Sequence, residues 1–434
     1  MLTTTKRDLP LIIAAGFVRA MTVGFIGVVL AVLLYRNGLN SIQIGFVIGA
    51  GLAGAAVATS LSALYVDRFG RRRSLALLTA LAAVPAFALA WRPGFVPLLA
   101  LSFVGMLNAM GSDRSAASAI EQAIIPGLVN DRRRTWTLSW YNVALDTGTA
   151  AGSLFASLPV LLSRWSGVDL LVGYRYVLCG LGSLGIASLA AYLLLSRSAE
   201  ATVDRNLKAH RVSPETKRVI SKLAALFSLD AFGGGFLADA LISYWFFRRF
   251  GVPEQSLGVL FAVIHVLNAM SHLGAAWLSR RIGLVNTMVF THLPSSLFLM
   301  AVPFAPSFPV AAFLLLCREA LVEMDVPTRQ SYTAAVVRTE ERTFAAAITN
   351  VARNVGWATS SSFSGIFMRT ISLAAPIFIG SSLKIIYDIA LFVSFRNLRP
   401  PEESPHVRAD LVRPSSIPAS VDTRNSHKIG GMPL

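Results

Sequence analysis

The sequence has few charged residues and almost no cysteine. Of its 434 residues only 14% are charged and two are cysteines, whereas 54% are hydrophobic and the mean hydropathy is +0.60. This composition excludes a soluble globular chain and is typical of a protein that crosses the membrane several times. Cys179 and Cys317 lie in apolar segments, so no disulfide framework is expected.

Motifs for several kinds of chemistry are also missing. The sequence contains no G-x-x-x-x-G-K-[ST] loop, which argues against direct use of ATP. Its six histidines form no set with metal-ligand spacing, so neither a metal nor another cofactor is expected. A nucleophile elbow and a soluble catalytic domain are absent too, and we therefore expect no enzyme. The first apolar run lacks a small-residue cleavage pattern and indicates a first span rather than a cleaved signal.

The meaning of the net charge of +16 depends on where the basic residues lie along the sequence. The basic residues lie in short gaps between apolar runs, which indicates orientation in a bilayer and not binding of nucleic acid. They concentrate on the side of both termini, so both termini are predicted to be cytoplasmic, in a multi-pass protein of the inner membrane. Twelve apolar segments are long enough to span about 30 Å. These segments are 10–35, 42–66, 74–91, 96–125, 135–163, 172–196, 221–247, 256–279, 285–305, 308–337, 343–370 and 375–395.

The chain contains two repeats. One set of residues in the first half recurs at nearly constant spacing in the second half. The first set of pairs is Arg36 with Arg248, Gly38 with Gly251, Gly45 with Gly258, Arg68 with Arg281 and Gly70 with Gly283. A second set pairs Gln122 with Gln330, Arg134 with Arg342, Asn142 with Asn350 and Gly148 with Gly356. Many transporters are built from two repeats of membrane helices. We expect an N-terminal six-helix bundle in 1–196, a cytoplasmic linker in 197–220, a C-terminal six-helix bundle in 221–396 and a disordered cytoplasmic tail in 397–434.

A short charged loop joins the second and third apolar segments. It runs from Ala63 to Arg73 and reads A-L-Y-V-D-R-F-G-R-R-R. This loop resembles the signature G-x-x-x-D-R-x-G-R-R-[RK] of the major facilitator superfamily, with Ala63 in place of the usual glycine. The matching residues are Asp67, Arg68, Gly70, Arg71, Arg72 and Arg73. Segments 229–236 and 325–332 look like a bacterial and archaeal branch of that superfamily with no assigned substrate. The resemblance implies an all-α polytopic membrane protein, with twelve transmembrane helices in two pseudo-symmetric bundles, a lipid bilayer around it and a small-molecule substrate. We also expect a monomer.

Ionisable residues inside the predicted spans cost about 2.5 to 3.5 kcal/mol each to insert, so their positions point to function. The candidates for substrate binding or coupling are Arg19, Asp146, Asp230, Arg318, Glu319, Glu323 and Arg353. Arg19 and Asp230 lie at similar depths on the first helix of each repeat. They could form an ion pair between the halves, structural or state-selecting, or provide a cationic substrate contact beside a protonatable coupling carboxylate.

Other intramembrane residues have expected partners as well. Glu319 and Glu323 could meet Arg353 across a central cavity, or act as alternative protonation sites. Asp325 and Arg329 are predicted to form a gate or scaffold pair.

Two further pairs concern helix packing. Lys384 and Asp388 are four residues apart and are expected to pair along their helix. The repeat mates Asn142 and Asn350 could offer their amides to a polar solute or hold neighbouring helices together.

The repeats also suggest a gate. Glu121 aligns with Arg329, and residues of opposite charge at equivalent positions could pair when the halves close at the cytoplasmic side. Arg114 and Glu121 are seven apart and are predicted to share one face of a helix. In the family the loop aspartate is thought to engage the start of the eleventh helix, which implies a contact between Asp67 and Arg342.

The features together favour a secondary active transporter that moves a small solute by alternating access and is coupled to protons. A carrier of organic anions or phosphoesters that uses Arg19 and Arg353, or a drug efflux pump, is an alternative within transport. A membrane scaffold or sensor that keeps the fold without transporting is an alternative of another class.

The loop contact generates a test. Replacing Asp67 by Asn should weaken the latch and shift the protein toward the state open to the cytoplasm. Cysteine crosslinking that shows unchanged cytoplasmic accessibility would refute the latch and leave the loop as a determinant of topology.

Overall fold

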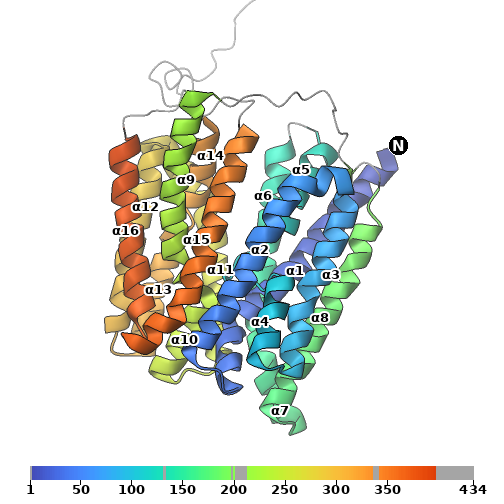
Figure 1. The fold of residues 1–434 in the computed structure, drawn as a ribbon, viewed down its shortest axis with the longest axis vertical. Coiled ribbons are helices and arrows are strands. Elements are labelled where there is room, and N and C mark those ends of the chain that lie inside the picture. Colours follow the sequence, from blue (N-terminus) through green and yellow to red (C-terminus); the bar gives the residue numbers. More distant parts are fainter. Residues whose placement is uncertain (1, 131–132, 197–198, 201–212, 336–341, 397–434) are drawn as a thin grey trace, which may run out of the picture.

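The computed structural model describes residues 2–130, 133–196, 199–200, 213–335 and 342–396. Within these, the side chains of 2–6, 134–135, 214–215, 273, 276, 334–335 and 342–347 are outside the description. The described chain forms two bundles of helices that lie side by side (Figure 1). The start of α1, the start of α9 and the end of α16 lie at the same end, called the termini end below.

In the described part of the N-terminal bundle there are eight α-helices and a short 3₁₀ turn. They are α1 (Leu2–Arg36), α2 (Ser41–Phe69), α3 (Arg71–Trp91), α4 (Phe95–Val104), α5 (Ala116–Leu128), α6 (Arg134–Leu154), η2 (Phe155–Ser157), α7 (Leu158–Ser166) and α8 (Leu170–Leu193).

The C-terminal bundle repeats this plan. Its elements are α9 (Pro214–Gly235), α10 (Asp239–Phe250), α11 (Glu254–Ile282), α12 (Leu284–Ala301), η4 (Val302–Phe304), α13 (Phe308–Val322), α14 (Asp325–Ala335), α15 (Arg342–Thr370) and α16 (Ala375–Phe395). The first of these helices, α9, begins inside the predicted linker, most of which lies outside the described residues together with the tail.

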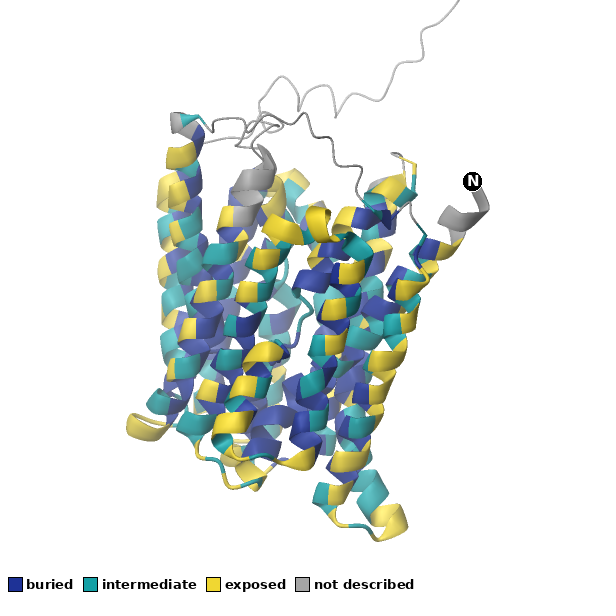
Figure 2. Ribbon diagram, turned by 45° about the vertical axis from the view of Figure 1, so that its right-hand side comes forward, coloured by how far each residue is buried: buried dark blue, intermediate teal, exposed yellow. Residues whose placement is uncertain are grey.

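The helices account for the twelve predicted spans. Within the described residues, nine helical stretches are long and apolar enough to cross a membrane. The other three spans are not among the nine: 96–125 and 308–337 are divided into helices that are each too short to cross a membrane alone, and α15 carries many polar residues. In Figure 2 buried residues face the interior of the bundles and exposed residues face outward. Many of the exposed residues are large and apolar, as expected for a chain in lipid.

Three of the spans are broken near their middle. Residues 105–115 separate α4 from α5, residues 236–238 separate α9 from α10, and Glu323 and Met324 separate α13 from α14. In the first break Asn108 donates to the carbonyl of Ser112 (2.8 Å) and accepts from the amide of Met110 (2.9 Å), which replaces helical hydrogen bonds. The prediction that Arg114 and Glu121 share a helix face is therefore wrong, because Arg114 precedes α5.

The bundles are bonded to each other toward the end opposite the termini, called the closed end below. The Ser243 hydroxyl donates to the carbonyl of Val28 (2.6 Å), and Arg36 bonds Glu254 across the interface (2.8 Å). Glu254 is buried, and its charge is neutralised by Arg36 of the other bundle; it also accepts a hydrogen bond from the Tyr174 hydroxyl of that bundle (2.8 Å). Helices α2 and α15 pack closely here as well.

Close helix packing inside the N-terminal bundle requires a missing side chain at Gly24 of α1. A Cβ atom there would overlap the carbonyl of Thr149 on α6. We expect Gly24→Val to lower the stability by about 1–3 kcal/mol or more, because overpacking forces the two backbones apart. Thermal unfolding in detergent measures the loss. Gly180→Val is the matched control, since a Cβ at Gly180 meets nothing within 4 Å, and equal losses in both variants would contradict the explanation.

Candidate functional site

A polar cavity lies between the bundles where the three broken spans meet. Its volume is about 130 Å³. It is lined by equal numbers of basic and acidic side chains, which are Arg114, Arg318, Arg329, Arg353 and Lys384 on one hand and Asp230, Asp239, Glu319, Glu323 and Asp325 on the other. Charges at this depth of a membrane protein have to be paired or functional.

Asp230 of α9 is the centre of a cluster within the C-terminal bundle. Its carboxylate lies 2.7 Å from Nζ of Lys384, 3.3 Å from a guanidinium nitrogen of Arg353 and 3.4 Å from one of Arg329. Arg329 in turn bonds Asp325 at 2.6 Å, four residues earlier on α14, so the predicted pairing of these two is present. Asp230 is buried, and three cations surround one carboxylate.

Arg19 of α1 is the centre of the equivalent cluster in the N-terminal bundle. Its guanidinium bonds Asp113 (2.7 Å), Glu121 (2.5 Å) and the hydroxyl of Tyr192 (2.7 Å). Glu121 is fully buried and also accepts from the hydroxyls of Tyr141 (2.5 Å) and Tyr192. All three guanidinium nitrogens of Arg19 donate to these partners, and Arg19 is not among the residues that line the cavity.

The two clusters occupy equivalent positions with opposite charges. The first helix of each repeat provides Arg19 or Asp230, and the helix after the break of the fourth span provides Glu121 or Arg329. The expected ion pair between Arg19 and Asp230 is therefore absent here, and each residue is paired within its own bundle. The gate pair of Glu121 with Arg329 concerns the state closed at the termini end, and it stays a prediction for that state. Each residue is neutralised inside its own bundle, where packing fixes the distance whichever way the bundles move.

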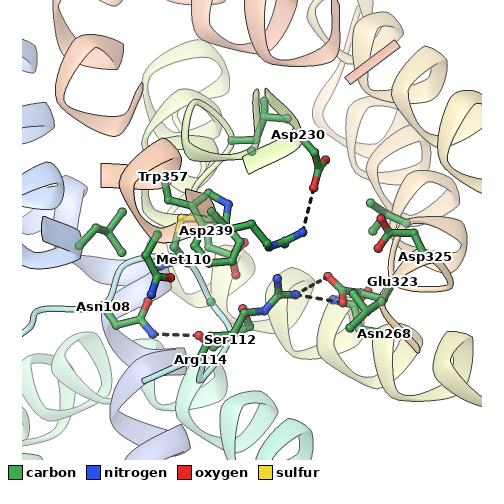
Figure 3. Close-up of a pocket in the computed structure, with 18 of the residues that line it drawn as sticks. Asn108, Met110, Ser112, Arg114, Asp230, Asp239, Asn268, Glu323, Asp325 and Trp357 are labelled. Carbon is green, nitrogen blue, oxygen red and sulfur yellow. Dashed lines mark hydrogen bonds and ion pairs between the residues drawn. The ribbon is translucent and has the colours of Figure 1, made fainter. Parts of the chain in front are cut away.

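One ion pair at the cavity crosses the interface and joins two of the breaks. Arg114 lies 3.2 Å from the carboxylate of Glu323, and Figure 3 shows the guanidinium directed at it. The Arg114 guanidinium also lies 5.3 Å from the ring centre of Trp357, and that of Arg353 lies 4.8 Å from it. The expected contact of Glu319 and Glu323 with Arg353 is wrong, since Glu319 bonds Arg318 instead.

Two carboxylates near the interface have weaker partners, and both partners are histidines of α11. Asp239, the first residue of α10, lies 3.5 Å from Nε2 of His265. Asp146 of α6 lies 4.0 Å from Nε2 of His272 across the interface. One oxygen of Asp146 and Nε2 of His265 are buried without a hydrogen-bond partner.

The remaining predicted residues lie away from the cavity or bond differently. Asn142 and Asn350 are exposed and are not cavity-lining residues. Lys384 bonds Asp230 while Asp388 bonds His292 (2.9 Å), so the expected pairing of Lys384 with Asp388 is wrong. Each of the two side chains instead has a buried partner on another helix, Asp230 of α9 for Lys384 and His292 of α12 for Asp388.

The charged loop is held by a residue from the segment after α8. Asp67 bonds Arg71 (3.1 Å) at an exposed position, and Arg68 is exposed as well. Glu200 accepts from the backbone amides of Arg71 (2.7 Å) and Arg72 (3.3 Å) at the start of α3, just after Gly70. The Arg342 side chain lies outside the described residues, so its contact with Asp67 stays a prediction.

Some site residues were not expected from the sequence. Asp239 directly follows the break after the glycines 233–235, and a charged residue beside such a glycine run inside a span is the pattern that could have revealed it. Glu254 and Glu200 carried no comparable pattern. The part of the chain that the structure describes brings no three His, Cys, Asp or Glu side chains together as a metal site.

Comparison with known proteins gives consistent results along most of the chain. The family model of the Major Facilitator Superfamily matches residues 12–361. An uncharacterized membrane protein of Saccharomyces cerevisiae is 23% identical over 422 residues, which cover 90% of this chain and 94% of the relative.

Solved structures show the same fold at low identity. A bacterial homologue of the human lysosomal transporter Spinster, in an inward-facing conformation, has a TM-score of 0.68 at 15% identity, covering 90% of this chain and 95% of that one. The nucleoside transporter NupG has a TM-score of 0.70 at 12% identity (89% and 100% covered), and a D-xylose–proton symporter has 0.69 at 16% (90% and 97% covered).

The geometry of Asp230 predicts a structural role. We expect Asp230→Asn to destabilise the protein by about 3–5 kcal/mol, because Lys384 and Arg353 would lose the counter-charge that neutralises them in the buried cluster. Thermal unfolding provides the measurement, and Asp169→Asn, which changes an exposed helix cap, is the control. A fully stable Asp230→Asn protein would contradict this role.

The cross-bundle bond predicts coupling between Arg114 and Glu323. In a double-mutant cycle of Arg114→Gln and Glu323→Gln, each single change should cost stability, and the double change should cost less than the sum by about 1 kcal/mol, since both side chains are partly exposed. Strictly additive losses would show that the bond contributes nothing.

Proposed function

Because the chain belongs to the major facilitator superfamily, whose members are transporters, we propose that it is a secondary active transporter that moves a small solute across a membrane by alternating access. The observation that carries this proposal is the charged cavity between two bundles that are bonded to each other toward one end. Rocking of one bundle against the other would expose such a cavity to each side in turn.

The orientation proposed for the chain follows from its basic residues. The termini end carries the arginine-rich loop around Arg71 and the start of α9, so it would face the cytoplasm of a cell bounded by the inner membrane. With the closed end outside, the conformation described here would be closed to the exterior.

The solute is proposed to be polar and to carry no net charge. The cavity presents five basic and five acidic groups, which leaves no excess charge for a strongly anionic or cationic ligand. Arg19 was an expected anion contact, but its donors are used inside the N-terminal bundle. The similar structures include transporters of a nucleoside and of xylose, which are polar solutes of this kind.

Proton coupling is part of the proposal. Intramembrane carboxylates and histidines face the same cavity, and such groups can carry a proton from one side to the other. A structurally similar D-xylose–proton symporter makes the same coupling a reasonable premise for this chain.

Uptake by proteoliposomes tests the function. Purified protein would be reconstituted and supplied with radiolabelled sugars, nucleosides, amino acids and organic anions, under an inward proton gradient. We expect uptake of at least one neutral polar solute above that of protein-free liposomes, and its collapse when a protonophore removes the gradient. Uptake of organic anions alone would contradict the proposed solute class, and uptake insensitive to the protonophore would contradict proton coupling.

A further inference from the structure

Asp239 stands apart from the other carboxylates of the cavity in its lack of a fixed cation. The described residues place no lysine or arginine nitrogen within 4.0 Å of it, and His265 is its neighbour at 3.5 Å. By contrast, Asp230, Asp325, Glu319 and Glu323 each bond at least one lysine or arginine. Those four can lose their charge only by leaving a buried cation unpaired, which is costly.

The histidine beside Asp239 is also incompletely bonded. His265 is 5% exposed, and its Nε2, the atom nearest Asp239, has no hydrogen-bond partner. The neighbouring side chain on the same face of α11, Asn268, has an unbonded buried Oδ1. A buried carboxylate and imidazole at this distance can share one proton, because either group can accept it and the other can then bond to it.

The other charged groups around Asp239 are already balanced. Arg318 and Glu319 of α13 bond each other, and Glu323 bonds Arg114 of the break in the N-terminal bundle. From α1 the contact is Gly27, which carries no charge. Among these neighbouring groups, Asp239 is therefore the one whose charge is not balanced by an ion pair.

Asp239 also lies where the bundles meet. A Cβ at Gly111, which has a φ of +77°, would overlap the Asp239 carboxylate, and the amide of Ala240 donates to the carbonyl of Ala109 (3.2 Å). Further along α10, Ser243 bonds Val28 and Tyr244 bonds Ser41 (3.3 Å) of the other bundle. Helix α10 thus begins at the cavity and continues as part of the closed end (Figure 1, Figure 3).

We propose that Asp239, together with His265, is the site that binds the coupling proton. This inference rests on the proposed function and names the group that the proton occupies. A neutral carboxyl packs against the backbone of Gly111 at lower cost than a carboxylate does, so the protonated form favours the closed end as it is seen here. Loss of the proton favours separation of α10 from the N-terminal bundle and opening toward the exterior.

A distance measurement tests the site without knowledge of the solute. In a C179A/C317A background, the substitutions S166C and S307C place nitroxide labels on exposed positions at the closed end, one on each bundle. Pulsed electron paramagnetic resonance in nanodiscs then measures the distance between the two labels, and the distance distribution gives the ratio of closed to open protein. One proton held about tenfold more tightly by the closed state makes this ratio about tenfold higher at pH 5 than at pH 8.

The variants decide between sites. Asp239→Asn should keep the low-pH ratio at every pH, whereas Asp169→Asn, the same change at an exposed helix cap, should keep the wild-type curve. Should Asp239→Asn not fold, His265→Gln takes its place and should move the midpoint of the curve. A pH response that survives Asp239→Asn, or one that only Asp146→Asn removes, overturns the assignment.

The two proposals can fail separately. Protonophore-sensitive uptake combined with a distance ratio that does not change with pH would overturn the site and leave transport in place. Absence of uptake for every solute tested, with a normal pH response of the distances, would overturn the proposed function and leave Asp239 as a proton-binding group of the interface.

Discussion

A charge inside a membrane protein needs a counter-charge, and in this chain that constraint decides which helices can move together. Arg19 and Asp230 are each surrounded by partners from their own bundle, so the bonds that neutralise them need not break when the bundles rock. Bonds that cross the interface, such as Arg114 with Glu323, have to be exchanged or lost in such a motion. The interior charges are therefore of two kinds. Some form bonds within one bundle and keep it rigid, and others form bonds to the opposite bundle that change when the bundles move.

The broken spans concentrate the interface groups at one depth. Arg114 lies in the non-helical segment 105–115, which separates α4 from α5. From there its side chain reaches Glu323 at the break between α13 and α14, a direction that the face of a continuous helix would not give it. The break before α10 brings Asp239 to the same cavity. Non-helical backbone is tolerated at this depth where protein or a water-filled cavity surrounds it, and discontinuous helices of this kind form the sites of many transporters.

The two repeats place ion pairs of opposite polarity at equivalent positions. Equivalent positions hold Arg19 with Glu121 in one half and Asp230 with Arg329 in the other, so the pairing has been retained while its sign differs. The C-terminal cluster contains more cations and lines the cavity, whereas Arg19 and Glu121 of the N-terminal cluster bond Tyr141 and Tyr192 and are not cavity-lining residues. Two halves with one architecture thus provide unequal surfaces to a solute.

The sequence by itself determined the class, the twelve spans, the repeat and the family, because apolar length and loop charge act locally and need no knowledge of neighbours. It also identified most of the intramembrane charges, including Arg114, Asp230 and Glu323. Only the tertiary structure decided their partners, since a bond between α1 and α5 or between α9 and α16 depends on helix rotation and on breaks that hydropathy does not report. For the same reason Asp239, one apolar-flanked carboxylate among others in the sequence, became distinctive only when the described residues placed no lysine or arginine nitrogen within 4.0 Å of it.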